Sequence, residues 1–294
     1  MVIYEKKAIA NKATIYWAND DKEALERILM LVKRAEAQSL HLDYAPILSE
    51  IGLEKALAKE SFTIQPSLPS HLVLQQAKER ATHAEHLLLD KSRKGIIDFA
   101  NKKFNFEIDA TGKGANQETL ELLRSKVNKY PVFPSVSIFN PDFMFSESGS
   151  LLWMDNEGSS SWNLSCTSIN IAILGIEQIM HKFDERFREC LPVFNLYRHG
   201  QMESNFLNML YGPAHKDEKD GPSQLYIILL DNGRSDLLAN PNLRDALIDL
   251  EGWSQWFART WSRKVKKSNF PQDQINRFRP VSYTHLTLPT ICSV

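Results

Sequence analysis

Three short apolar runs after residue 130 constrain the fold of the chain more than any other feature. They read VSIF, SLLWM and LYIILL, they begin at residues 136, 150 and 225, and Asn, Pro, Asp or Gly residues bound them. Runs of this length are typical of strands that are buried on both faces of a sheet. Because helical segments alternate with them, we predict an α/β fold in which a mainly parallel sheet carries helices on both faces.

Apolar residues recur at helical spacing in segments 21–37, 47–58, 72–89 and 117–127. Asp20 or Asp21 is placed to cap the first of these helices. Segment 63–71 contains two prolines, so we predict a loop there. The apolar segment 169–183 is long enough for a helix or for a helix and a strand, and periodicity does not separate the two.

The composition argues against several classes of partner. The 35 basic and 36 acidic residues nearly cancel, which does not favour nucleic acid or an anionic membrane as the main ligand. No segment approaches the roughly 20 apolar residues of a membrane helix. The first residues also lack the apolar core of a secretory signal. We therefore expect a cytoplasmic protein with no membrane span and no nucleic-acid partner.

The three cysteines are sparse. Cys166, Cys190 and Cys292 lie far apart in the sequence and form no C-x-x-C pair. An odd and scattered set argues against a disulfide framework and fits a reducing compartment. These residues also cannot by themselves supply the clustered thiolates of an iron–sulfur site.

The segment SESGSLLWMDNEG, residues 146–158, is the first candidate for a ligand site. It places a polar, glycine-containing turn at each end of an apolar strand, and these turns consist of Ser146, Glu147, Ser148 and Gly149, and of Asn156, Glu157 and Gly158. Ligands of open α/β sheets bind at strand ends, where glycine lets the backbone approach and N–H groups hold anions. A glutamate there has the chemistry of a base, a nucleophile or an orienting acceptor. The alternative is a hairpin or βα turn whose glutamate is simply solvated.

A second polar turn directly follows LYIILL and extends the candidate pocket. It consists of Asp231, Asn232, Gly233 and Arg234. Asn-Gly favours turn geometry with positive φ, and the guanidinium of Arg234 is a planar fork suited to a carboxylate or a phosphate. We therefore expect a small anionic ligand at this pocket. The alternative is an ordinary turn with a surface arginine.

The order of these motifs resembles the LUD domain of lactate-utilisation proteins, and the protein-B type in particular. The resemblance covers residues 10–236 and is carried by SESGSLLWMDNEG, INIAILGIEQI, HGQ, YGPAHKDEKDGP and LDNGRS. The family pattern has an acidic residue and a hydroxyl before its first glycine, here Glu147, Ser148 and Gly149. It then has an Asn-Glu-Gly turn, here residues 156–158, and a Gly-Ile-Glu run, here residues 175–177.

This resemblance implies a fold similar to the sugar-isomerase and CoA-transferase superfamily, with a Rossmann-like sheet. It also implies a subunit or accessory protein of a complex that oxidises L-lactate to pyruvate. The partners would then be other lactate-utilisation subunits. The resemblance does not assign the chemistry to this chain, so whether the chain is itself an enzyme stays open.

The sequence departs from the protein-B type after residue 236. That type has a cysteine-rich, ferredoxin-like module there, whereas this chain reads ALIDLEGWSQWFARTW without a cysteine. We therefore expect no cofactor in this chain, the family's [4Fe-4S] clusters having been lost. The expected organisation is a LUD domain at 1–236, a C-terminal helical extension at 237–280 and a non-native readthrough at 281–294.

Two residues are candidates for catalysis. His71, in a Pro-Ser-His sequence, is an acid/base candidate that titrates near neutral pH if exposed. Glu147 resembles the nucleophile of class I CoA-transferases, which makes an independent acyl-transfer enzyme an alternative function. A small-ligand-binding regulatory domain is a further alternative. We predict no metal site, because His83 and His86 lack further ligands nearby and are better explained as a solvated helix face.

Overall fold

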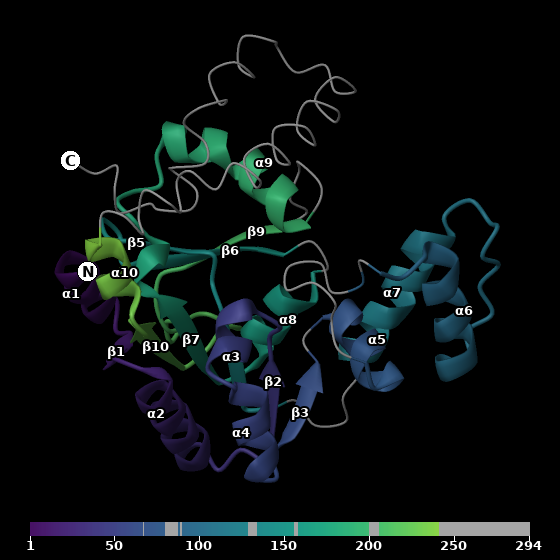
Figure 1. The fold of residues 1–294 in the computed structure, drawn as a ribbon, viewed down its shortest axis with the longest axis horizontal. Helices are drawn as coiled ribbons and strands as arrows, with labels where there is room; N and C mark the ends of the chain where they lie inside the picture. Colours follow the sequence, from purple (N-terminus) through teal and green to yellow (C-terminus); the bar gives the residue numbers. More distant parts are fainter. Residues whose placement is uncertain are drawn as a thin grey trace.

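A computed structural model of the chain describes residues 1–66, 68–79, 88, 90–128, 134–155, 158–199 and 206–240 (Figure 1). Within these ranges the main element is a parallel sheet of six strands in the order β1-β10-β7-β4-β2-β3. Its strands are β1 (Thr14–Ala18), β2 (Ser39–Leu42), β3 (Thr63–Pro66), β4 (Val136–Phe139), β7 (Ile169–Gly175) and β10 (Gln224–Leu230). All neighbouring pairs run parallel, so the predicted α/β fold with a mainly parallel sheet is confirmed.

The direction in which successive strands are added across the sheet changes once. From β2 the chain continues outward to β3, and from β4 it continues the opposite way to β7 and β10. This is a doubly wound arrangement, and its reversal lies between β2 and β4. β1 stands outside this pattern: it is the first strand of the chain and pairs with the last strand of the sheet, β10.

One face of the sheet is covered by α2 (Asp21–Arg34), α3 (Pro46–Glu50) and α4 (Leu53–Lys59). α2 begins where the Asp20 side chain accepts the N–H of Glu23 at 2.8 Å. Its apolar stripe packs on alternate residues of the strands, so the two periodicities meet in one buried cluster. This cluster includes Ala24, Ile28, Leu31, Ile138, Ile171, Ile173 and Ile228.

The opposite face is covered by α1 (Val2–Ala10), by α8 (Ser159–Cys166) and by a second sheet. The second sheet has the order β8-β5-β6-β9, with β8 (Ile179–Met180), β5 (Phe143–Phe145), β6 (Ser150–Asp155) and β9 (Phe206–Leu210). The 3-10 turn η1 (Ile176–Gln178) links β7 to β8. α9 (Glu185–His199) covers the second sheet, where the rings of Phe143 and Phe145 each lie 5.0 Å from that of Phe187.

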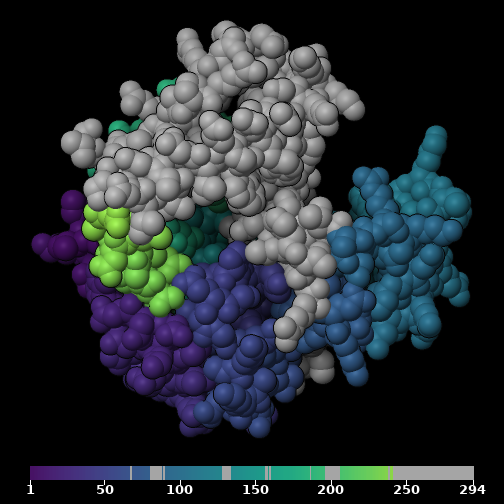
Figure 2. Space-filling model, viewed as in Figure 1, coloured from purple at the N-terminus to yellow at the C-terminus, as the bar shows by residue number. Residues whose placement is uncertain are grey.

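The connection from β3 to β4 is a helical lobe made of α5 (Pro69–Ala77), α6 (Arg93–Phe104) and α7 (Ala115–Asn128). Figure 2 shows that it projects from one side of the molecule. The lobe has a small core of its own, formed by Leu72, Val73, Ala100, Leu123 and Val127. α10 (Arg234–Ala239) is the last described helix and directly follows β10.

Segment 63–71 is not the predicted loop. It contains strand β3 and the start of α5. Both prolines fit: Pro66 ends an edge strand, where a missing N–H costs no ladder bond, and Pro69 occupies the first helical position, where its N–H would be unused. α5 therefore begins before residue 72 and ends at Ala77, short of the predicted 89, and residues 80–87 lie outside the described ranges.

Segment 169–183 forms β7, η1 and β8 and contains no α-helix. The predicted helix 47–58 is two short helices, α3 and α4. The proposed boundary at residue 236 falls inside α10. Because everything from residue 241 onward lies outside the described residues, the extension 237–280 and the readthrough 281–294 stay predictions.

We expect Ile171→Ala to lower the free energy of unfolding by about 2–5 kcal/mol, because it leaves a cavity between the sheet and its helices. Ile171 is fully buried in the main cluster. The matched control is Ile3→Ala, at a side chain that is 62% exposed on α1, where the change stays within about 0.5 kcal/mol. Urea unfolding followed by circular dichroism measures both, and equal effects would contradict the assigned core.

Candidate functional site at the carboxyl edge of the sheet

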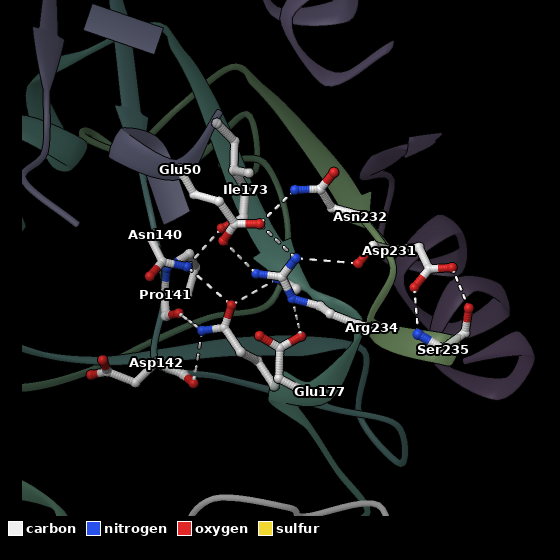
Figure 3. A network of polar contacts seen from close by, with 12 residues as sticks. Glu50, Asn140, Pro141, Asp142, Ile173, Glu177, Asp231, Asn232, Arg234 and Ser235 are labelled. Carbon is white, nitrogen blue, oxygen red and sulfur yellow. Dashed lines mark hydrogen bonds and ion pairs between the residues drawn. The ribbon is translucent and has the colours of Figure 1, made fainter. Parts of the chain in front are cut away.

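The loops after β4, β7 and β10 meet at one edge of the sheet, because parallel strands place their carboxyl ends on the same side. Asn140 follows β4, Glu177 follows β7 and Arg234 follows β10 (Figure 3). Glu50, at the end of α3, reaches the same place from the helical layer. These loops bring together polar side chains that are far apart in the sequence.

Arg234 is the centre of this arrangement. Its Nη1 and Nη2 donate to the two carboxylate oxygens of Glu50 at 3.0 and 2.8 Å, and its Nε lies 2.8 Å from Oε2 of Glu177. Nη1 also donates to the carbonyl of Asp231 at 3.2 Å. A planar fork that holds two oxygens at once fixes geometry as well as charge. Arg234 thereby joins the β10 loop to α3 and to η1.

Arg234 and its carboxylate partners stabilise one another in their charged forms. Burial alone lowers the pKa of Arg234, but its hydrogen bonds to Glu50 and Glu177 outweigh that effect and leave the pKa raised. The hydrogen bond from Arg234 in turn lowers the pKa of Glu50, against an opposing effect of burial. The guanidinium is therefore charged and already faces two carboxylates. An anionic ligand that used Arg234 would have to displace one of them.

Gly175 is needed because the carboxylate of Glu177 folds back over it. A Cβ at residue 175 would lie 2.1 and 2.3 Å from the two carboxylate oxygens of Glu177, well inside van der Waals contact. Any side chain at this position would push Glu177 away from Arg234. The Gly-Ile-Glu run therefore has a packing explanation at the end of β7.

Gln178 connects the β7 loop to the β4 loop. Its Nε2 donates to the carbonyls of Pro141 and Asp142 at 2.7 and 3.2 Å, and its Oε1 accepts the N–H of Gly175 at 2.8 Å. Asn140 donates to the carbonyl of Ile173 at 2.7 Å. Backbone groups that would be unpaired at strand ends are thus satisfied within the fold.

The predicted turn Asp231–Arg234 belongs to this group. Asn232 donates to Glu50 Oε1 at 2.6 Å, and the Asp231 carboxylate accepts the N–H of Ser235 at 2.7 Å. Gly233 precedes α10 with a φ of 81°. We call Glu50, Glu177, Asn232 and Arg234 the Arg234 network. Its contacts bind parts of the protein to one another, and a ligand at this turn stays a prediction.

The turn Ser146–Gly149 has different surroundings. It is the hairpin turn between the antiparallel strands β5 and β6. The N–H groups of Ser146 and Glu147 donate to the carbonyls of Met180 and His181 at 2.8 and 2.9 Å, and the Gly149 N–H donates to Phe145 at 2.8 Å. Glu147 is exposed. Three N–H groups that could hold an anion are therefore used by the fold itself.

Gly149 serves close packing of this hairpin on α1. A Cβ there would lie 2.6 Å from the backbone N of Ala8, and its φ is 74°. The Ser148 carbonyl also accepts the side-chain amide of Asn11 at 2.8 Å. The two predicted turns therefore have different neighbours: Ser148 and Gly149 contact α1 and the residue that follows it, while Arg234 contacts α3 and η1.

The turn at the other end of β6 is only partly described, since Asn156 and Glu157 lie outside the described residues. Gly158 immediately precedes α8. The carboxylate of Asp155 accepts the N–H groups of Gly158 and Ser161 at 2.6 and 3.0 Å. Asp155 thus places a negative charge at the N-terminus of α8, where an anionic ligand would otherwise be stabilised.

A row of buried polar side chains crosses β3, β2 and β4 on the face opposite α2, α3 and α4. Gln65, His41 and Ser137 are register neighbours, with exposures of 9%, 0% and 3%. Such positions in a parallel sheet are ordinarily apolar. His71, in the first turn of α5, is 8% exposed and hydrogen-bonds to the backbone of Leu42 at the end of β2. Polar groups are thus concentrated beside the reversal of the sheet.

Both histidines are uncharged at neutral pH. Burial lowers the pKa of His41 and of His71 to about 4, although hydrogen bonds to backbone groups oppose this. His71 therefore does not titrate near pH 7, as it would if exposed, because α5 buries it. Its catalytic role stays a prediction.

Sequence reasoning missed Glu50 as a partner of Arg234. The two residues are 184 positions apart, and nothing local to Glu50 marks it, since it ends a short helix. Glu177 belonged to the Gly-Ile-Glu run of the family resemblance, but the run does not reveal its ion pair. His41 had one visible signal, a histidine between the two leucines of β2.

The described residues contain no group of three or more His, Cys, Asp or Glu side chains arranged to hold a metal ion. Burial raises the pKa of the thiols of Cys166, at the end of α8, and of Cys190, in α9. Both are free thiols. His83, His86 and Cys292 lie outside the described residues. In the part of the chain that the structure describes, no helix is long and apolar enough to cross a membrane.

Comparison with known proteins gives a family match. The sequence profile of the LUD domain matches residues 3–230. Lactate utilization protein B of Anoxybacillus flavithermus is 25% identical over 226 residues, which are 76% of this chain and 47% of that protein. The uncharacterized electron transport protein YkgF of Escherichia coli is 23% identical over 242 residues, which are 82% and 50% of the two chains.

The chain thus spans about half the length of the curated relatives it matches. Among solved structures, a DUF162 family protein from Deinococcus radiodurans matches with a TM-score of 0.40 and 11% identity. That match covers 78% of this chain and 94% of the other.

We expect Arg234→Met to lower the free energy of unfolding by about 1–3 kcal/mol, because Glu50 and Glu177 lose their charged partner. Arg93→Met, at an exposed arginine at the start of α6, is the matched control and has little effect. Since Arg234 lowers the pKa of Glu50, the contribution is complete above the ordinary pKa of Glu50 and is lost as pH falls. Urea unfolding should therefore show that the difference in unfolding free energy between wild type and Arg234→Met becomes smaller as the pH is lowered.

The buried histidines predict a second pH effect. The pKa values of His41 and His71 fall from 6.5 to about 4 on folding. As the pH is lowered, these histidines therefore become protonated in the unfolded chain before they do so in the folded chain. Their contribution to stability is therefore complete above pH 6.5 and decreases toward pH 4. As the pH is lowered from 6.5 to 4, the urea midpoint of unfolding should fall less steeply for His71→Gln than for wild type. His215→Gln, at an exposed histidine, should follow wild type, and equal slopes for all three proteins would contradict the burial of His71.

Proposed function

The chain belongs to the LUD domain family, and on that premise we propose that it acts in lactate utilisation as a component of a complex that oxidises L-lactate to pyruvate. The observation that carries the proposal is the match of residues 3–230 to the LUD domain, together with relatives named lactate utilization protein B. A relative named as an electron transport protein points the same way. The cytoplasm, where free thiols persist, is the proposed compartment.

Within this complex the electrons pass to another subunit. Oxidation of lactate to pyruvate releases two protons and two electrons, so an acceptor is required. An iron–sulfur cluster of the common kind needs about four thiolates. This sequence has three cysteines, and of these Cys166 lies on α8 and Cys190 on α9. We therefore propose that this chain holds no cluster of its own and that its partners are other lactate-utilisation subunits.

The geometry supports a binding or assembly role over covalent catalysis. The Arg234 network joins three loops at the carboxyl edge, and its charges are paired with one another. An acyl-transfer nucleophile needs N–H donors for the developing oxyanion. The N–H groups of Ser146, Glu147 and Gly149 already have backbone partners, so the hairpin does not favour the CoA-transferase alternative.

We expect affinity purification of the tagged chain from lactate-grown cells to recover lactate-dependent reduction of an artificial electron acceptor. The purified chain alone should show none, because it lacks an electron carrier. Glu147→Gln should recover the same activity as wild type, since its carboxylate is an exposed hairpin side chain. Recovery of the folded chain without any lactate-dependent reduction would contradict the proposal. Loss of activity with Glu147→Gln would instead support acyl-transfer chemistry.

A further inference from the structure

The reversal of the sheet marks a site that the sequence motifs do not. In doubly wound sheets the loops diverge at the reversal, and ligands bind in the crevice outside the carboxyl ends of the two strands there. In this chain those strands are β2 and β4. Asp43 and Tyr44 follow β2, and the first turn of α5 lies beside them, since His71 hydrogen-bonds to Leu42.

His71 presents an unused hydrogen-bond acceptor at this place. Its hydrogen bond to the Leu42 backbone favours the protonated ring, so the ring donates there. The other nitrogen, Nδ1, is buried and has no partner among the described residues. In a neutral imidazole that donates through Nε2, Nδ1 carries a lone pair. Leaving such a group unpaired in the interior costs free energy, so a buried Nδ1 indicates a missing donor.

Gln65, on the edge strand β3, carries a second buried acceptor. Its Oε1 is buried, and the structure gives it no partner in the described part of the chain. Gln65 lies on β3 opposite His41 of β2, on the sheet face away from the main cluster. The open position on each side chain is therefore an acceptor, and a ligand that satisfies the one on His71 must bring an O–H or N–H group.

The first turn of α5 provides the complementary charge. Backbone N–H groups in the first turn of a helix, including that of His71, have no partner within the helix. The residue before the helix is Leu68, which makes no capping bond, and the first turn contains no acidic residue. This differs from α8, where Asp155 fills that role. The start of α5 therefore favours a bound negative charge.

Two carboxylates follow β2 and β4 in the sequence, and each accepts a backbone N–H. Asp43 accepts the N–H of Tyr44 at 2.9 Å, and Asp142 accepts the N–H of Met154 at 2.7 Å. The Tyr44 ring lies edge-on to the His71 ring, with centroids 5.7 Å apart, and is partly exposed. Because Nδ1 of His71 is shielded from solvent, the side chains that cover it must shift when a ligand reaches it.

We propose that this switch-point site, formed by Tyr44, Gln65, His71 and the first turn of α5, binds a small 2-hydroxycarboxylate. The carboxylate accepts the N–H of His71, and the neighbouring hydroxyl donates to Nδ1 of the same residue. His71 alone thus binds both the carboxylate and the hydroxyl, which are on adjacent carbons of the ligand. The choice of this ligand class rests on the proposed function in lactate utilisation, while the location rests on the reversal of the sheet and the unpaired acceptors.

The site distinguishes the alcohol from the ketone. Pyruvate and propionate carry the same carboxylate but offer no hydroxyl to His71, so either one leaves the buried acceptor unpaired. We therefore expect L-lactate to bind the purified full chain at least about tenfold more tightly than pyruvate or propionate, as measured by isothermal titration calorimetry.

Two substitutions of His71 separate its roles. His71→Gln keeps a donor near the position of Nε2 for Leu42 but removes the Nδ1 acceptor, so preference for lactate over propionate should disappear while weak carboxylate binding remains. His71→Asn keeps a polar group near the position of Nδ1 and should retain part of the preference. His215→Gln, at an exposed histidine, should bind as wild type does. Circular dichroism confirms that each variant is folded.

In ¹⁵N-histidine-labelled wild type, lactate should also shift the Nδ1 resonance of His71, which reports the contact independently of affinity. The proposal is overturned if the folded wild-type chain binds no L-lactate up to about 50 mM. It is likewise overturned if pyruvate or propionate binds equally well, or if His71→Gln leaves the preference unchanged. A chain that recovers lactate-oxidising activity from cells but binds no lactate overturns this site alone. A chain that binds lactate but recovers no activity overturns the proposed function alone.

Discussion

The pairing of Arg234 with Glu50 and Glu177 is the interaction on which the carboxyl edge of the sheet depends. Each of the three residues comes from a different connection, so the guanidinium sets how α3, the β7 loop and the β10 loop lie relative to one another. The requirement extends to Gly175, which must lack a side chain so that Glu177 can reach the guanidinium. A cation that organises the protein in this way has little capacity left for a ligand.

Glycine-containing turns that are similar in sequence have different structural roles in the fold. The Glu-Ser-Gly turn uses its glycine to approach α1, the turn after β6 begins a helix that Asp155 caps, and the turn after β10 joins an ion-pair group. Glycine beside a carboxylate is compatible with ligand binding and equally with close packing. Family membership is therefore better supported here than a ligand role for any one motif residue.

Local pattern predicted the strands well, since VSIF is β4, SLLWM lies within β6 and LYIILL lies within β10. It also predicted α2, whose apolar stripe and Asp20 cap are both local features. It failed for Thr63–Pro66, where edge position made a proline acceptable in a strand. It could not pair Glu50 with Arg234 or show that His71 is buried, because both facts depend on which distant segments pack together.

The placement of β1 has a consequence for how the domain is made. β1 is synthesised before the other described strands, but it pairs with β10, which begins at residue 224. Its hydrogen bonds must therefore wait until nearly the whole domain has been synthesised, and contacts so distant in sequence are slow to form. Until then β1 lacks its partner strand in the sheet. The six-stranded sheet is completed only when β1 and β10 pair, so the two most distant strands of the sheet in sequence close it together.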